Sequence, residues 1–265
     1  MHTVNTPFGP SLPEAGWVPA PRYALRRACI MEAMDELPVG RVLEIGCGAG
    51  ALLAEFADRG FDVTGVEMSS EGRRRAEMFA ADARNMRILE EPSASWSAEF
   101  DYLFSFEVLE HIEDDVSALR QWVQWLKPGG HALISVPAHM RLWGRSDHFA
   151  GHFRRYSKEG VKNLLSEAGL TDVSVGIYGF PISNMIEPVR NAYHGRLLKR
   201  GASERDMKAA SENSGIDRDL ESRLFPLMAN FPGKQLFDVG VAMQRMLRHS
   251  NLGTGWIATG RKSGG

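Results

Sequence analysis

The amino-acid sequence predicts an α/β protein built on a doubly wound parallel sheet. Short apolar runs alternate with helical segments along most of the chain, and the central runs are mostly apolar. Strands of that kind are typical of a sheet that helices cover on both faces. A length of 265 residues fits one such domain with an insertion, so we expect a single domain over residues 1–265.

The expected elements follow one another in the order that this fold class requires. We expect strands at residues 41–46, 61–66, 86–90, 100–106, 131–136, 172–178 and 255–261, and helices at 23–37, 50–59, 70–84, 114–126 and 157–168. Four prolines mark residues 1–20 as an irregular N-terminal arm, and the segment that leads to Arg155 is expected to be a loop.

A helical insertion at residues 180–251 precedes the last expected strand. Its end carries Phe237, Val241, Met243 and Leu247 at helical spacing. Such a face either packs into the core, forms a dimer contact or belongs to a cap over a substrate. The sequence leaves these alternatives open.

Composition and charge argue against a nucleic-acid-binding, disulfide-rich or membrane-spanning protein. The formal net charge of -2 gives no electrostatic preference for nucleic acid, although residues 196–205 form a local basic run. Cys29 and Cys47 are the only cysteines, so a disulfide framework is not expected and a cytoplasmic location fits. We find neither an apolar run long enough to span a bilayer nor a signal-peptide pattern.

The most informative motif is Val42-Leu43-Glu44-Ile45-Gly46-Cys47-Gly48-Ala49-Gly50, with Glu67 at the end of the next strand. Glycines let the backbone approach a ligand closely, and the acid can accept both ribose hydroxyls of a nucleoside. NAD enzymes use a similar fingerprint. The G-x-G-x-G spacing, the acid Glu44 within the strand end and the Lys127-Pro128-Gly129-Gly130 turn favour S-adenosylmethionine instead.

These residues resemble the class I S-adenosylmethionine-dependent methyltransferases over residues 23–178 and the terminal strand. The resemblance implies a Rossmann-like, seven-stranded sheet whose last strand is antiparallel. It also implies a cofactor site formed by the glycine turn, the first helix and the ends of the first, second and fourth strands. The implied contacts are Tyr23, Glu44, Gly46, Cys47, Gly48, Gly50, Glu67, Met68 and Phe106. Many relatives place an aspartate just after the third strand, whereas residues 90–95 of this chain contain none.

A second group of residues, Glu107-Val108-Leu109-Glu110-His111, follows the fourth strand directly. In open α/β sheets that position borders the ligand crevice. If the segment is helical, Glu107, Glu110 and His111 share one face. Two carboxylates and an imidazole that converge would form half of a divalent-metal site.

The other half of this site is expected in the loop that runs from Asp147 to Tyr156. Glu-x-x-Glu-His with a later loop histidine resembles two metal-dependent groups, the small-RNA 2′-O-methyltransferases and the ubiquinone-pathway O-methyltransferases. The resemblance implies Glu107, Glu110, His111 and His152 as ligands of Mg, Mn, Fe, Co or Zn. Two alternatives stay open: a purely structural role, as in metal-free relatives, and His152 as a lone base.

The same loop supplies the remaining catalytic candidates beside His111 and His152. Arg155 could clamp a carboxylate or phosphate of the substrate, or serve as an internal ion-pair partner. Tyr156 could bond the substrate or pack as an aromatic plug. Asp147 could orient a histidine or act as a turn residue.

The sequence therefore predicts a methyltransferase that acts on a small molecule. A hydroxyl oxygen is the expected acceptor, because a metal lowers the pKa of a bound oxygen and orients it. Methylation of nitrogen or carbon without a metal is one alternative. An RNA acceptor and a non-catalytic, cofactor-binding assembly subunit are others, and the insertion could form a homodimer contact.

Overall fold

The computed structural model describes residues 3–81, 83–199 and 225–264. Its centre is a seven-stranded sheet in the order β5-β4-β3-β6-β7-β9-β8. The strands are β3 (Arg41–Ile45), β4 (Asp62–Val66), β5 (Met86–Leu89), β6 (Phe100–Phe106), β7 (Leu126–Pro137), β8 (Leu170–Tyr178) and β9 (Gly255–Lys262). The last strand, β9, lies antiparallel between β7 and β8. The predicted fold class and the reversed final strand are both confirmed.

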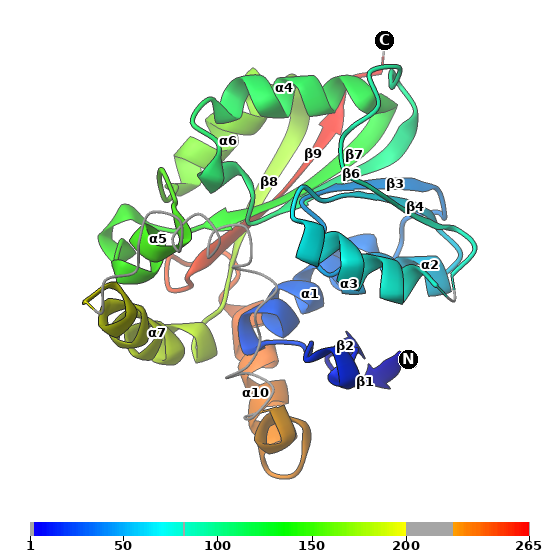
Figure 1. The fold of residues 1–265 in the computed structure, drawn as a ribbon. Coiled ribbons are helices and arrows are strands. Elements are labelled where there is room, and N and C mark those ends of the chain that lie inside the picture. Colours follow the sequence, from blue (N-terminus) through cyan, green and yellow to red (C-terminus); the bar gives the residue numbers. More distant parts are fainter. Residues whose placement is uncertain (1–2, 82, 200–224, 265) are drawn as a thin grey trace.

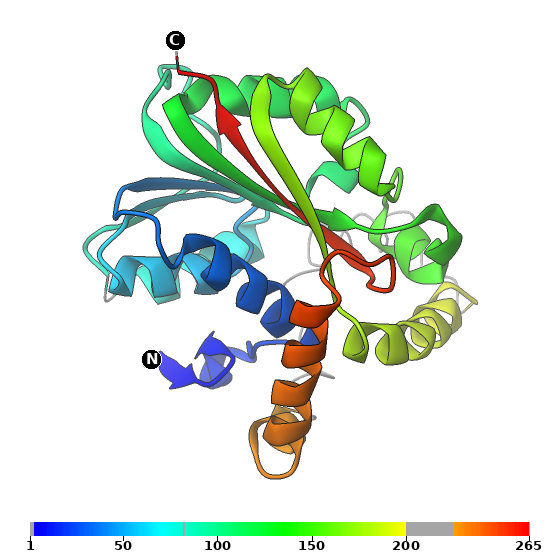
Figure 2. The same cartoon turned by 180° about the vertical axis from the view of Figure 1, so that it is seen from behind.

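Helices cover both faces of the sheet, as the apolar central strands require (Figures 1 and 2). One face carries α1 (Pro21–Met34), α2 (Ala51–Asp58) and α3 (Ser70–Ala80), and the other carries α4 (Asp115–Trp125) and α6 (Lys158–Glu167). Neighbouring strand residues point to opposite faces, so Val42 packs with the first set of helices and Leu43 with the second.

The N-terminal arm is more ordered than its prolines predict. Residues 3–20 form a short hairpin of β1 (Val4–Thr6) and β2 (Gly9–Ser11), followed by the 3-10 turn η1 (Pro13–Ala15). Phe8, Leu12 and Trp17 are buried in the core. The expectation of an irregular arm was wrong because these three large apolar side chains anchor the segment under α1.

The segment expected to be a loop before Arg155 is partly helical. It contains the 3-10 turn η3 (Met140–Leu142) and the helix α5 (Arg145–Ala150). Asp147 accepts the backbone N–H of Gly144 at 2.8 Å and so caps the start of this helix.

The described parts of the insertion pack onto the same chain. They comprise α7 (Ile182–Lys199), a helical turn at residues 225–229 and α10 (Gly233–Met246), while residues 200–224 and part of the basic run lie outside the described residues. The buried side of α10 is formed by Phe237, Gly240 and Gln244, whereas Met243 is exposed. Met243 lies on a different side of α10 from Phe237, because six residues along a helix make about one and two-thirds turns.

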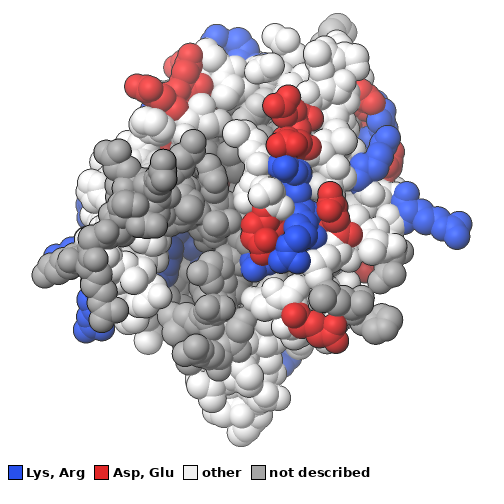
Figure 3. Space-filling model, in the orientation of Figure 1, with Lys and Arg blue, Asp and Glu red and all other residues white. Residues whose placement is uncertain are grey.

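Among the described helices none is long and apolar enough to cross a membrane. On the face shown in Figure 3, basic and acidic side chains lie next to one another. Glu71, for example, pairs with Arg74 and Arg75 on α3.

Candidate active site

The glycine turn lies at the carboxyl end of β3, where open α/β sheets bind ligands. Gly46, Gly48 and Gly50 all have positive φ angles, of 71°, 55° and 75°. A Cβ atom on Gly46 would come within 2.5 Å of Val108 Cγ2, whereas a Cβ on Gly48 would meet nothing within 4 Å. Glycine is therefore needed at the first position for packing, and the second position faces open space.

Glu67 holds this turn from the end of β4. Its Oε2 accepts the backbone N–H of Gly48 at 2.8 Å, and its Oε1 accepts that of Ser69 at 2.8 Å. The adjoining Met68 side chain is 82% exposed. Cys47 packs against β4, where a Cβ on Gly65 would lie 2.6 Å from its Sγ, and burial raises the pKa of its thiol. We call Glu44, residues 46–50 and Glu67 the glycine-turn half of the site.

Glu44 is a buried carboxylate that is incompletely bonded within the described residues. Its side chain is almost fully buried, and Oε2 has no hydrogen-bond partner. Burial raises its pKa to about 8, against the opposing charge of Arg26. The Arg26 guanidinium lies 5.6 Å above the ring of Phe106. Tyr23, from the same helix, is buried edge-to-face against Trp17.

Glu107 does not share a helical face with Glu110 and His111. It has a φ angle of 61°, and only Leu109–His111 form a 3-10 turn, η2. Its carboxylate pairs with Arg22 and accepts the hydroxyls of Tyr178 at 2.8 Å and Ser135 at 3.1 Å. Although burial raises the pKa of Glu107, the charges of Arg22 and Arg26 outweigh this effect and hold the pKa well below its usual range.

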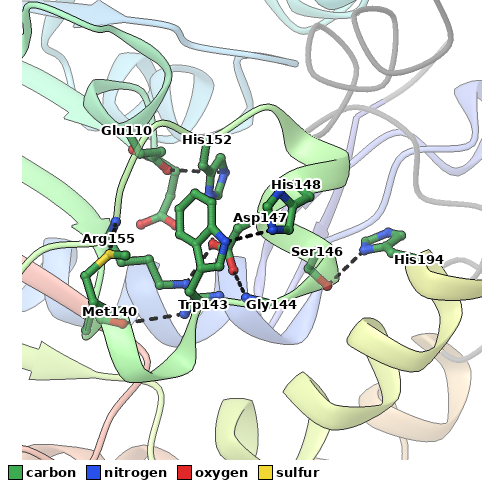
Figure 4. Close-up of polar contacts among 12 residues, drawn as sticks. Glu110, Met140, Trp143, Gly144, Ser146, Asp147, His148, His152, Arg155 and His194 are labelled. Atoms are coloured by element: carbon green, nitrogen blue, oxygen red, sulfur yellow. Dashed lines mark hydrogen bonds and ion pairs between the residues drawn. The ribbon is translucent and has the colours of Figure 1, made fainter. Parts of the chain in front are cut away.

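Glu110, His111 and His152 come together at this end of the sheet (Figure 4 shows Glu110 and His152). One potential ligand atom from each lies within 4.8 Å of the others. Glu110 is fully buried, and neither carboxylate oxygen has a hydrogen-bond partner among the described residues. Burial and the neighbouring Glu107 raise its pKa well above the usual value. We call these three residues the histidine half of the site.

The two imidazoles of this group are in different environments. Burial and the nearby His152 lower the pKa of His111 to about 4. The rings of His111 and His152 meet edge-to-face at 4.7 Å. Nδ1 of His152 lies 2.9 Å from Asp147 Oδ1, while its Nε2 lies 4.0 Å from Glu110 Oε1. Burial raises the pKa of Asp147, but the hydrogen bonds from His152 and Arg155 outweigh it and hold the pKa below its usual range. With an ionised carboxylate as the acceptor, Nδ1 of His152 is the donor of this contact.

Arg155 and Tyr156 make internal contacts in the folded chain. Arg155 is buried and donates from Nε to Asp147 Oδ1 and from Nη2 to Glu187 Oε1, each at 2.7 Å. Tyr156 is buried and donates its hydroxyl to Asp115 Oδ2 at 2.6 Å. Of the alternatives left open for these two residues, the structure shows the internal ones: Arg155 pairs with Asp147 and Glu187, and Tyr156 is buried against Asp115.

Of the four residues expected as metal ligands, Glu110, His111 and His152 have potential ligand atoms close together, and Glu107 does not join them. Glu107 is outside the group because its left-handed backbone turns the carboxylate toward Arg22. Sequence reasoning missed Arg22, Tyr178 and Glu187. The i, i+4 spacing of Arg22 and Arg26 on the first helix was a usable signal for Arg22. Nothing local marks the other two.

A family model described as a methyltransferase domain matches residues 22–175. The chain belongs to this methyltransferase family. The match contains the glycine-turn half and the histidine half, together with all strands of the sheet from β3 to β7. It confirms the class I S-adenosylmethionine-dependent group that the motifs resemble.

Curated ubiquinone biosynthesis O-methyltransferases are similar to part of the chain. The protein from Alkalilimnicola ehrlichii is 34% identical over 117 residues, which cover 42% of this chain and 47% of the relative. The protein from Escherichia coli O127:H6 is 33% identical over 117 residues, which cover 42% of this chain and 49% of the relative. The chain spans about half the length of the curated relatives that it matches.

Solved structures share the fold over most of the chain. The cyclase SpnF aligns with a TM-score of 0.59 and 18% identity, over 92% of this chain and 82% of its own. Phosphoethanolamine N-methyltransferase 2 of Haemonchus contortus, solved with S-adenosyl-L-methionine, aligns with a TM-score of 0.55 and 18% identity, over 90% of this chain and 52% of its own. At these identities only the fold is shared, so the reaction is argued from the residues.

Proposed function

We propose that the protein transfers a methyl group from S-adenosylmethionine to a hydroxyl oxygen of a small molecule, assisted by a divalent cation at Glu110, His111 and His152. The observation that carries the proposal is Glu110, a fully buried carboxylate beside two imidazoles, with neither oxygen bonded to any residue that the structure describes. A buried acid without partners costs stability unless a ligand or cation completes it. The matched curated relatives are named as O-methyltransferases.

The glycine-turn half suits the cofactor. The unbonded Oε2 of Glu44 fits the cationic methionine end, and open space beside Gly48 fits the approach of a ligand to the backbone. Glu67 retains lone pairs for the ribose hydroxyls beyond the two bonds it accepts. Arg26, above Phe106, supplies a positive charge for the methionine carboxylate. Tyr23, Cys47 and Met68 are proposed to line this half.

The histidine half suits a divalent cation rich in nitrogen ligands. With the proton of His152 on Nδ1, its Nε2 keeps a lone pair directed toward Glu110. Two imidazoles and one carboxylate fit Mn, Fe, Co or Zn better than Mg. Such a cation would lower the pKa of the acceptor hydroxyl and orient it.

The chain's own residues then serve an in-line displacement. The acceptor oxygen forms a bond to the methyl carbon, the carbon–sulfur bond breaks, and its electron pair returns to sulfur. Products are a methyl ether and S-adenosylhomocysteine, and the hydroxyl proton passes to water. Glu44 and Glu67 hold the donor, while the histidine half holds the acceptor opposite it. The Asp147–His152 pair supports a second, metal-free mechanism, in which Nε2 of His152 removes the proton.

The first test is cofactor binding and the atom that is methylated. Titration with S-adenosylmethionine should give a dissociation constant in the micromolar range, which corresponds to a binding free energy of about -8 kcal/mol. Mass spectrometry of the product from a panel of hydroxylated and aminated acceptors should place the methyl group on oxygen. Methylation of nitrogen or carbon would overturn the O-methyl assignment. Binding without turnover on any acceptor would favour the assembly-subunit alternative.

The second test is removal of metal. Extensive chelation should abolish turnover while leaving cofactor affinity unchanged, and Mn²⁺, Co²⁺ or Zn²⁺ should restore it. Full activity after chelation would instead favour His152 as a base.

A further inference from the structure

Helix α7 of the insertion presents one polar face to the segment that carries His152. Glu187, Asn191 and His194 are spaced i, i+4 and i+7 and therefore lie on the same side of the helix. Asn191 Oδ1 accepts the backbone N–H of Ser146 at 2.9 Å. His194 Nδ1 lies 2.9 Å from Ser146 Oγ (Figure 4), and its ring stacks on Phe149 at 4.6 Å. Two of the three residues thus dock α7 onto α5.

Glu187, the third residue of this face, makes a different contact. It bonds Nη2 of Arg155, whose Nε bonds Oδ1 of Asp147, and the same Oδ1 accepts Nδ1 of His152. The distances along this chain of contacts are 2.7, 2.7 and 2.9 Å (Figure 4 shows its last two contacts). Glu187, Arg155 and Asp147 are all buried. A planar guanidinium held at both ends has one orientation, so Glu187, together with the backbone N–H of Gly144 on Oδ2, holds Asp147 in place.

We propose that Glu187 is a positioning residue for the histidine half: through Arg155 and Asp147 it holds the ring orientation and tautomer of His152. The inference rests on the proposed function only in taking His152 as a working residue of the site. Glu187 lies beyond residues 22–175, the stretch that matches the methyltransferase family. The insertion of this chain therefore completes the site that the family region supplies.

A purely structural role would make Glu187 one more contact between α7 and α5. Asn191 separates the two possibilities, because it docks the same two helices without touching Arg155. Glu187→Leu removes the acceptor for Arg155, Glu187→Gln keeps an acceptor oxygen without the charge, and Asn191→Ala removes docking alone. All three variants are compared with wild type after thermal unfolding has shown that each is folded at the assay temperature.

The decisive readout needs neither metal nor turnover. Diethyl pyrocarbonate modifies accessible imidazole nitrogen, and the rate at His152 is followed by peptide mass spectrometry in the cofactor-free protein. The His152 side chain is 12% exposed, so release of its ring should speed modification several-fold in Glu187→Leu. Glu187→Gln should stay near the wild-type rate, and so should Asn191→Ala. Equal rates in all four proteins would overturn the proposal, and so would equal acceleration in Glu187→Leu and Asn191→Ala.

Kinetics give a second, independent readout. Glu187→Leu should lower kcat about 10- to 100-fold, the usual loss when a group that orients a site histidine is removed. The KM for S-adenosylmethionine should not change, because Glu44 and Glu67 lie in the other half. Glu187→Gln should recover most of kcat. A rise in KM with unchanged kcat would contradict positioning. If chelation leaves wild-type turnover intact, the metal proposal fails while the modification rates still decide the role of Glu187.

Discussion

The glycine-turn half and the histidine half differ in how their groups are held. The first is built from neighbouring strand ends, and its key atoms are backbone N–H groups and the carboxylate of Glu67, which bonds them. The second depends on side chains from η2, the α5 segment and α7. They are connected by buried side-chain contacts, of which Arg155–Glu187 joins residues 32 positions apart in the sequence. Contacts made by backbone groups persist when neighbouring side chains are substituted. In a network of side-chain hydrogen bonds, substitution of one residue also breaks the contacts of its partners.

The largest expected effect is on catalysis, in the histidine half. Glu110→Gln should lower kcat about 100- to 10,000-fold, because an amide is a poor cation ligand and cannot replace a carboxylate. The raised pKa of Glu110 indicates a neutral acid in the free protein, so the isosteric amide should leave the free energy of unfolding nearly unchanged. Turnover and urea unfolding measure the two quantities.

A nearby histidine provides the control for this substitution. His148 accepts Trp143 Nε1 at 2.9 Å and lies outside the three-residue group. His148→Asn should keep turnover within about twofold, as surface substitutions usually do. If Glu110→Gln lost no more activity than His148→Asn, the histidine half would not be the reaction centre.

The next effect is on stability, in the glycine-turn half. Gly46→Ala should cost about 2–5 kcal/mol of unfolding free energy, from a strained left-handed backbone and from contact with Val108. Gly48→Ala adds its Cβ to open space and should cost only the backbone strain, about 1–2 kcal/mol. The main effect of Gly48→Ala should be weaker binding of S-adenosylmethionine. Urea denaturation of both variants measures the loss of unfolding free energy. Equal losses in Gly46→Ala and Gly48→Ala would contradict this prediction.

A smaller effect is the pH dependence of cofactor binding through Glu44. Its folded pKa of about 8 lies above its ordinary value of 4.5. Because the cationic cofactor pairs with the ionised form, binding below pH 8 must release a proton. Affinity should therefore rise by up to about tenfold per pH unit from pH 6 to pH 8 and then level off. Calorimetric titration in buffers of different ionisation enthalpy measures the released proton, and Glu44→Gln should remove the slope.

Glu44 also determines how the stability of the cofactor-free protein changes with pH. Without cofactor the folded state binds this proton more tightly than the unfolded state. Glu44 therefore makes the protein less stable as pH rises from about 4.5 to about 8, and Glu44→Gln should flatten that fall. The unfolding free energy of wild type and of Glu44→Gln is compared between pH 4.5 and pH 8. If the two proteins show the same pH dependence, Glu44 is not a buried neutral acid.

The contrast between the halves also explains what the sequence could predict. The glycine turn was found because its residues are contiguous and its positive φ angles require glycine. Strand β6 runs from Phe100 to Phe106 as expected, since a buried central strand is mostly apolar. Both signals are local, and the family resemblance added the antiparallel β9.

The histidine half was predicted only in part, for physical reasons. His152 and Glu110 were identified, but the partners of Arg155 and Tyr156 were not. Glu187 and Asp115 lie 32 and 41 residues away from them, and only the folded chain brings them together. Glu107 was misplaced because a helical spacing was assumed where one left-handed residue reverses the direction of the side chain.

The smallest expected effect tests the edge of the glycine-turn half at Met68. This side chain follows Glu67 and is 82% exposed, so its apolar surface is left for a bound adenosine to cover. Met68→Ala should weaken S-adenosylmethionine binding by about fivefold, near 1 kcal/mol, with no loss of unfolding free energy. Met185 on α7 is 74% exposed and serves as the matched control, since Met185→Ala removes a similar apolar side chain from the insertion and not from the glycine-turn half. If the two variants bind the cofactor equally well, Met68 is an ordinary surface methionine and the glycine-turn half ends at Glu67.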